Sequence, residues 1–221
     1  MTVQEFRELY KTVCGEDLTM SYLWKVLNDP KKMKSMDLAG DYALRAGQVL
    51  TQLMKEHGIL VSDIAVDALR AGMTDDYQIV ADFCDLIQQQ IYDRYGIGLK
   101  PQRPLLQQSR IDGLVTELTR IREAGSGVDD LFFDQVINAS ESVADNSTRY
   151  NAEFLSRCGY NSAIKRIPDR GACKYCLSLA GTHDAYEPGV WNRHTNCHCT
   201  IDYFIEGRTD HLKGGAGKGW R

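Results

Sequence analysis

Four cysteines and three histidines lie within 27 residues near the C-terminal end, and this cluster limits the possible folds more than any other feature of the chain. Cys173 and Cys176 form a C-x2-C pair, and His194, Cys197 and Cys199 follow after seventeen intervening residues. Two cysteines at this spacing on a tight turn point both sulfurs to the same side, where they can bind one metal ion, and a second pair of donors completes a tetrahedron. The sequence therefore predicts that Cys173 and Cys176 bind a metal ion together with two of His194, Cys197 and Cys199.

The second half of this cluster contains more donors than a tetrahedral ion needs. Side chains alternate along an extended segment, so Cys197 and Cys199 are expected to face the ion while His198 faces the other way. His183 lies in the segment between the two halves and remains an alternative ligand. The choice of four ligands among these candidates stays open at this point.

The expected ion is Zn²⁺ in a structural role. The segment after Arg166 has too few large apolar residues for a core of its own, and structural zinc can contribute on the order of 10–16 kcal/mol to the folding of such a unit. Catalytic zinc keeps one position open for water, whereas thiolate-rich sites are usually closed. The glutamate and Pro-Cys-x-x-Cys pattern of zinc deaminases is missing. We therefore expect no catalytic residues, no enzymatic activity and no small-molecule substrate.

The other three cysteines, Cys14, Cys84 and Cys158, are scattered among apolar neighbours and are expected to be buried as small hydrophobic side chains. An odd total of seven and the lack of an export signal argue against a disulfide framework. The first residues have neither the basic start nor the apolar stretch of a signal peptide, and no apolar run reaches the roughly 20 residues of a membrane span. The chain is therefore expected to mature in a cytoplasm and to have no membrane partner.

Apolar residues recur at three- and four-residue steps over most of the first 160 residues, which predicts a mainly α fold with a multi-helix N-terminal region. The stripes fall within residues 6–13, 22–27, 38–54, 62–69, 74–95, 111–121 and 129–155. Ser62 and Thr74 are expected to cap two separate helices, and the polar run 145–147 to bend or split the last one. Polar and apolar residues alternate over 200–204, which predicts a short strand that leaves the metal site.

The chain is expected to divide at changes in composition. Residues 96–104 contain two glycines and two prolines and are the best linker candidate, and the glycine-rich end is expected to be a flexible tail. The predicted organisation is a helical domain (1–95), a linker (96–105), a long helical segment (106–163), a small zinc-stapled α+β module (164–206) and a flexible tail (207–221).

The net charge is −4, so the chain as a whole has no field suited to nucleic acid. From Ile164 onward, however, nine Lys and Arg residues outnumber six Asp and Glu residues. This mildly basic end is a candidate for a weak contact with DNA.

Three runs of the sequence resemble the C-terminal signature of the MuF-like head-morphogenesis proteins, which are minor head proteins of tailed phages. The runs are residues 151–154, 166–181 and 190–200. The matching features are an arginine ahead of the first cysteine pair, Leu-Ala-Gly after it (179–181), and His-x-Asn-Cys-x-Cys-Thr (194–200). The specific match covers roughly residues 150 to 205. Several family members have a histidine in place of the second cysteine of the first half, and some lack that half, so the metal is expected to be more secure in this chain.

The resemblance implies a structural minor capsid protein that is assembled in the bacterial host cytoplasm and resides in the virion, inside the capsid or at the portal vertex. The implied partners are the portal protein and the major capsid protein. An alternative from another class is a zinc-dependent nucleic-acid-binding protein or nuclease of the His-Asn-His type, with His194, Asn196 and His198 as its active site. Such nucleases usually place the catalytic histidine on a strand ahead of a metal-binding helix.

Overall fold

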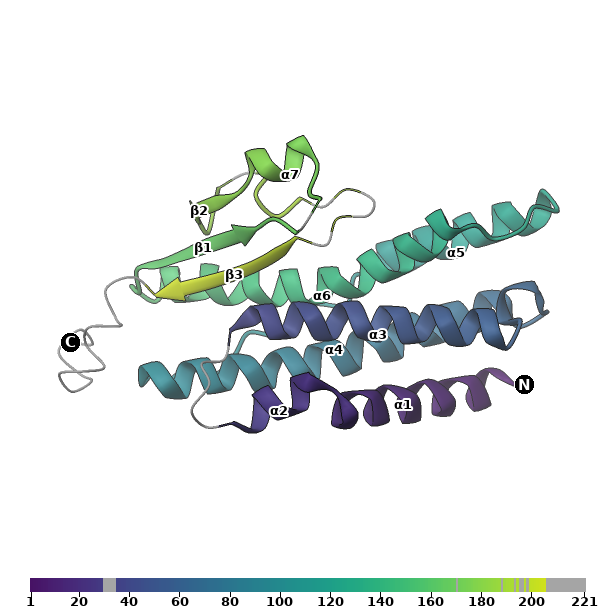
Figure 1. Cartoon of the computed structure of the whole chain (residues 1–221), viewed down its shortest axis with the longest axis horizontal. Coiled ribbons are helices and arrows are strands. Elements are labelled where there is room, and N and C mark those ends of the chain that lie inside the picture. Colours follow the sequence, from purple (N-terminus) through teal and green to yellow (C-terminus); the bar gives the residue numbers. More distant parts are fainter. Residues whose placement is uncertain are drawn as a thin grey trace.

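A computed structural model describes residues 1–29, 35–169, 171–187, 189–192, 194, 197 and 199–205, with the backbone only for Met20 and Tyr22. The described part is mainly α-helical and has a small antiparallel sheet near its C-terminal end, which confirms the predicted mainly α fold with a C-terminal α+β unit (Figure 1). The helices are α1 (Val3–Met20), α2 (Tyr22–Asn28), α3 (Met36–Glu56), α4 (Ala65–Tyr95), α5 (Gln108–Glu123), α6 (Asp130–Arg157) and α7 (Lys174–Ser178), with a 3-10 turn η1 (Ile59–Val61) between α3 and α4. The strands are β1 (Ser162–Ile167), β2 (Gly181–Asp184) and β3 (Thr200–Ile205).

Two helices are longer than the sequence predicted. The residues 62–69 and 74–95 belong mainly to one helix, α4, because the Thr74 hydroxyl donates to the Arg70 carbonyl of the preceding turn (2.8 Å) instead of capping a new helix. The predicted split at residues 145–147 is also wrong, since α6 continues through them. Some of its polar side chains bond within the helix, for example Thr148 Oγ1, which donates to Ala144 O (2.9 Å).

Helices α3, α4 and α6 pack closely and form the centre of the bundle, with α1 on the outer side of α4 (Figure 1). The contact between α3 and α6 is closest at a glycine. A Cβ atom at Gly47 would lie 3.0 Å from Ile137 Cα and 3.0 Å from Ser140 Cβ, so any larger residue would require α6 to shift by a few tenths of an ångström.

The connection between α4 and α5 is held against α6 by one amide side chain. Asn151 Nδ2 donates to Gln102 O (2.9 Å), and Asn151 Oδ1 accepts hydrogen bonds from Gln102 N (2.8 Å) and Tyr92 Oη (3.0 Å). The predicted linker therefore has a defined place along the bundle, where Asn151 supplies the hydrogen bonds that its non-helical backbone lacks.

The three strands form a sheet in the order β2-β1-β3, with both pairs antiparallel. Strand β3 is the strand that the sequence predicted, whereas β1 and β2 were not predicted. Helices α3 and α6 cover one face of the sheet, and Ile164, Tyr203 and Ile205 belong to the same hydrophobic core as the helices. The sheet is thus joined to the bundle by shared packing. The predicted domain boundaries themselves stay a prediction, and the expected tail lies outside the described residues.

Strand β3 also caps a helix from a distant part of the chain. Asp202 Oδ1 accepts hydrogen bonds from Met36 N (3.0 Å), the first residue of α3, and from Tyr203 N (2.8 Å). A carboxylate at a helix N-terminus satisfies an amide that has no partner within the helix. Burial, together with the charge of nearby Asp37, raises the pKa of Asp202 to about 7.

This raised pKa leads to a pH-dependent prediction. Between the unfolded-state pKa of about 3.9 and the folded-state value, the native protein binds more protons than the unfolded chain, so this contribution to stability is lost as the pH rises through 7. Asp202→Asn keeps an acceptor for Met36 N and does not ionise. Relative to the wild type, we expect the variant to gain roughly 1–3 kcal/mol of stability between pH 5 and pH 8, as measured by urea unfolding at both pH values. Asp67→Asn, which removes one charge from an exposed position, is the control. A wild-type-to-variant difference that is the same at both pH values would contradict the prediction.

Candidate metal centre

The five predicted ligands come together where α7 meets the start of β3. The sulfurs of Cys176, Cys197 and Cys199 lie within 4.8 Å of one another, and so do the sulfurs of Cys173 and Cys176 and a ring nitrogen of His194. Cys176 belongs to both groups. The two groups therefore meet at Cys176, although their members come from segments about twenty residues apart in the sequence.

The distances between the donors are those of a small coordination site. The Cys176 and Cys197 sulfurs are 3.6 Å apart, while His194 Nε2 lies 2.9 Å from Cys176 Sγ and 3.1 Å from Cys173 Sγ. In a tetrahedral zinc site the bond lengths imply about 3.8 Å between two sulfurs and about 3.6 Å between a sulfur and a nitrogen. The sulfur pair is close to this geometry, and small side-chain rotations would bring His194 to it. The cluster can hold a metal ion.

Each half of the site is built on a turn. Cys173 has an extended backbone conformation (φ −70°, ψ 167°) and caps the short helix α7, in which Leu177 N donates to Cys173 O (3.0 Å). In the second half, Cys197 N donates to His194 O (3.1 Å). In the first half, the two-residue spacing thus brings the sulfurs of Cys173 and Cys176 within 4.8 Å of each other.

The four cysteines differ in their surroundings. Cys176, Cys197 and Cys199 are buried, whereas Cys173 is exposed. Without a bound metal, burial and the neighbouring thiols of Cys199 and Cys197 raise the pKa of Cys176 to about 12, while a backbone hydrogen bond from Cys176 lowers the pKa of Cys173. Because metals bind cysteine as the thiolate, metal binding at this site must release protons.

A buried arginine supplies independent evidence that the cluster is negatively charged. Arg166, on β1, has a relative exposure of 1%. Its Nη1 donates to the carbonyls of Val190 and Asn192, and its Nη2 donates to Cys197 Sγ (3.5 Å). Within the described ranges, no carboxylate lies at ion-pair distance from this guanidinium.

An uncompensated buried charge costs several kcal/mol, so the protein needs a negative group beside Arg166. A divalent ion bound by three thiolates and one imidazole has a net charge of −1, and one bound by four thiolates has a net charge of −2. Either arrangement would balance Arg166. Sequence analysis did not identify this role, although Arg166 opens the run 166–181 that was singled out there, because nothing in the sequence shows that its side chain is buried.

The remaining candidates are placed elsewhere. Both ring nitrogens of His183 are engaged, Nδ1 with Glu187 Oε1 (2.9 Å) and Nε2 with Leu179 O (3.0 Å), so His183 is not part of the cluster. His198 lies outside the described residues. Cys14 and Cys84 are buried as predicted, but the prediction for Cys158 is wrong, because this residue ends α6 and its side chain is exposed.

One side of the metal centre faces a cleft of about 460 Å³ between the C-terminal unit and the helices. Its walls include His194 and Tyr175 from the metal centre, Trp191, and Arg110 and Asn146 from α5 and α6. The imidazole edge of the site is thus next to solvent-filled space, while the sulfurs of Cys197 and Cys199 are enclosed.

Comparisons of the chain with known protein families, with curated proteins and with solved structures found no match. None of the described helices is both long enough and apolar enough to cross a membrane.

The role of Arg166 can be tested through metal affinity. Removing a group that hydrogen-bonds to a metal ligand typically changes the affinity for the metal 10–100-fold. We expect Arg166→Met to weaken Zn²⁺ binding by about this factor, because the Cys197 thiolate then loses the guanidinium beside it, and Arg166→Lys to fall in between. Competition with a chromophoric chelator measures the affinity. Arg120→Met, at an exposed position on α5, is the control, and equal affinities for all four proteins would exclude charge balance by Arg166.

Proposed function

We propose that the Cys/His cluster binds one Zn²⁺ ion and that this ion stabilises the C-terminal unit of a structural protein. The observation that carries the proposal is that two groups of donors share Cys176, next to a buried guanidinium that needs a negative partner. Zinc suits sulfur and imidazole donors in tetrahedral arrangements better than other abundant divalent ions do.

The surroundings of the site explain why the protein would need the ion. Strand β2 is largely exposed, and among the described residues the hydrophobic cluster around the site consists of Cys176, Cys197 and Cys199, with Ala172 packed against them. Ala185 and Val190 reach the main core, but the cluster around the site is too small to hold α7 in place by apolar burial alone. A bound ion would join α7 to Cys199, which immediately precedes β3, and would thereby fix the register of that strand.

We further propose that the whole chain is a minor capsid or head-morphogenesis protein that acts through contacts with the portal protein, the major capsid protein or both. The support is the resemblance of residues 151–154, 166–181 and 190–200 to the MuF-like signature, since the arginine, the cysteines and the histidine of that signature lie together in one site. A virion location and a weak contact between DNA and the basic C-terminal end follow from the same proposal.

The metal-binding unit presents apolar side chains that would suit a protein partner. Tyr175 and Leu177, both on α7, have relative exposures of 45% and 57%. Exposed aromatic and aliphatic side chains on a rigid support commonly form the centre of protein interfaces. We propose that α7 contacts the head proteins through these exposed side chains.

The metal proposal predicts the metal content of the purified chain. We expect one zinc per chain by mass spectrometry, and a loss of zinc in Cys176→Ser, because Cys176 is common to both donor groups. Cys158→Ser, at an exposed position away from the site, is the control and should keep its zinc. Hydrogen exchange should show lost protection in β2 and the start of β3 in Cys176→Ser, while α3 and α4 stay protected. Zinc-free wild type, or unchanged protection in the variant, would refute the structural role of the ion.

The capsid proposal predicts association with head proteins. When the chain is co-expressed with the portal and major capsid proteins encoded beside it, we expect co-purification with at least one of them, and a reduction of at least tenfold in Tyr175→Ser/Leu177→Ser. A double variant at the exposed positions Glu117 and Arg120 of α5 is the matched surface control. If the wild type binds neither protein but nicks DNA in a metal-dependent way, the nuclease alternative replaces this proposal.

A further inference from the structure

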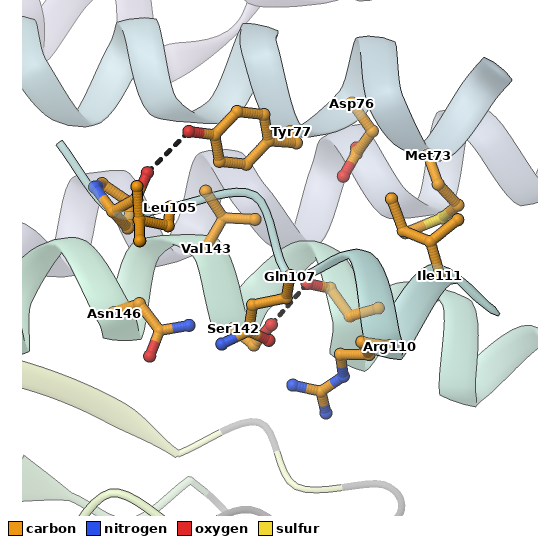
Figure 2. Close-up of a pocket in the computed structure, with 12 residues that line it drawn as sticks. Met73, Asp76, Tyr77, Leu105, Gln107, Arg110, Ile111, Ser142, Val143 and Asn146 are labelled. Carbon is orange, nitrogen blue, oxygen red and sulfur yellow. Dashed lines mark hydrogen bonds between the residues drawn. The ribbon is translucent and has the colours of Figure 1, made fainter. Parts of the chain in front are cut away.

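A buried acid lies where four helices of the bundle meet. Asp76 of α4 has a relative exposure of 0% and borders a small, mostly apolar pocket between α4, α6 and the connection that leads into α5 (Figure 2). Its Oδ1 accepts hydrogen bonds from Tyr10 Oη of α1 (2.7 Å) and from Ser140 Oγ of α6 (2.9 Å). Ser140 Oγ also lies 2.8 Å from Ala43 O of α3. The carboxyl group of Asp76 therefore connects α1 and α6 beside α3.

The second carboxyl oxygen, Oδ2, has no partner. It is buried and makes no hydrogen bond with any part of the chain that the structure describes. The neighbouring pocket has a volume of about 20 Å³, which is room for roughly one water. Oδ2 has no accessible surface through which that water could reach it. An ionised Asp76 would therefore leave one of its two charged oxygens without a hydrogen bond and without solvent.

No positive charge on the described residues forms an ion pair with Asp76. Arg7 and Lys11 of α1 both pair with the adjacent Asp75, at 2.7 Å and 3.5 Å. Arg110, which borders the pocket, points away from Asp76 (Figure 2). A buried carboxylate without a counter-charge is strongly disfavoured, and such a group usually takes up a proton instead.

The other titratable groups around Asp76 are uncharged near neutral pH. Burial raises the pKa of Cys14 on α1 to about 12, and it also raises the pKa values of Tyr10 and of Tyr42 on α3 above their usual value of 10. Helix α6 contributes the uncharged Ser140. Burial raises the pKa of Asp76 itself to about 7. Within this set, Asp76 is therefore the group whose charge changes near neutral pH.

Helix α1 is the member of this junction that separates with the smallest loss of packing. It packs on α3 and α4 along the outside of the bundle, whereas α3, α4 and α6 pack on one another at the centre (Figure 1). Among the described side chains of α1, Phe6, Tyr10 and Cys14 are buried, and they form one stripe with a spacing of four residues. Because Tyr10 is the middle residue of this stripe, a change of charge on Asp76 acts at the centre of the α1 contact.

We propose that a proton on Asp76 keeps α1 docked on the bundle, and that loss of this proton as the pH rises shifts α1 toward an undocked state. With α1 displaced, water reaches the ionised carboxylate from the side that Tyr10 covers. Phe6 and Tyr10 become exposed at the same time, so the bundle contains a pH-sensitive switch that presents an apolar helix surface. The inference depends neither on the metal centre nor on the proposed function.

The undocked state differs from the docked state in how tightly it holds the proton. An aspartate in water has a pKa of about 3.9. Between this value and the raised pKa of docked Asp76, the docked state therefore binds more protons than the undocked state. The docking equilibrium of α1 is expected to weaken by about tenfold for each pH unit in this range and to stay constant above it.

The test is hydrogen exchange of the full-length protein at pH 5 and at pH 8, corrected for the intrinsic exchange rate at each pH. We expect the protection of the α1 amides to fall by roughly 10–100-fold between these pH values, and that of the α6 amides to fall by less. In Asp76→Asn the side chain cannot ionise, and its amide group can donate to Tyr10 Oη and to Ser140 Oγ, so α1 should be equally protected at both pH values. Asp202 is present in both proteins, so its titration does not contribute to their difference.

Asp75→Asn is the matched control at the neighbouring position. It removes the contacts of Asp75 with Arg7 and Lys11, which also hold α1 but are charged at both pH values. Relative to the wild type, this variant should lose protection in α1 by the same factor at pH 5 and at pH 8.

Three results would overturn the proposal. The first is an α1 protection that does not change with pH in the wild type, or that changes equally in Asp76→Asn. The second is an equal loss of protection in α1 and α6, which would indicate global unfolding. The third is a loss confined to residues 96–107, which would place the opening at the pocket instead of at α1.

If Asp76→Asn does not fold, NMR of the Asp76 carboxyl carbon replaces that variant. The titration is followed in Asp202→Asn, which removes another acid whose pKa is about 7. A midpoint near pH 7 supports the proposal together with the exchange data of the wild type. A midpoint below pH 5 overturns it.

Discussion

The buried guanidinium of Arg166 and the cysteine cluster beside it depend on each other. Arg166 lies on the central strand of the sheet, and its hydrogen bonds reach the segment that carries the second half of the cluster. A buried arginine is costly away from negative charge, and three or more thiolates bound to one divalent ion would supply that charge. Its hydrogen bonds to Val190 O and Asn192 O also tie that part of the chain to the sheet. The contacts of Arg166 thus connect the centre of the sheet to the candidate metal site.

Helix α6 connects this unit to the rest of the protein. It contacts α3, α4 and α5 as well as strands β1 and β3. Along its length, Ser140 lies beside the buried acid of α4, Asn151 holds the connection before α5, and Ala152 O accepts a hydrogen bond from Ser162 at the start of β1. A helix that is surrounded in this way can carry many polar residues, because several of them find partners on neighbouring elements. The pocket with Asp76 and the cleft beside His194 both open along this helix.

Local patterns predicted much of the helical structure. The apolar stripes identified most helices, and Asp129 and Gly96 mark the helix ends that their residue types suggest. The errors at Thr74 and at residues 145–147 have a common cause. Polar residues were taken as breaks, although in a packed bundle their hydroxyl and amide groups bond to the preceding turn or to another helix. Strands β1 and β2 were missed because they are short and because the central strand contains a buried arginine, which hides the apolar alternation.

The sequence by itself determined the mainly helical fold and the set of residues from which a metal site could be built, since both depend on spacings of a few residues. Only the tertiary structure brought Arg166 to Cys197, Asp202 to the first turn of α3, and Asp76 to an apolar pocket without a partner for one oxygen. The first two contacts join residues that are 31 and 166 positions apart in the sequence. In the third, Tyr10 of α1 and Ser140 of α6 donate hydrogen bonds to Asp76 of α4. Charge balance and desolvation depend on which groups surround a residue in space, and the spacing of apolar residues along the sequence does not determine these neighbours.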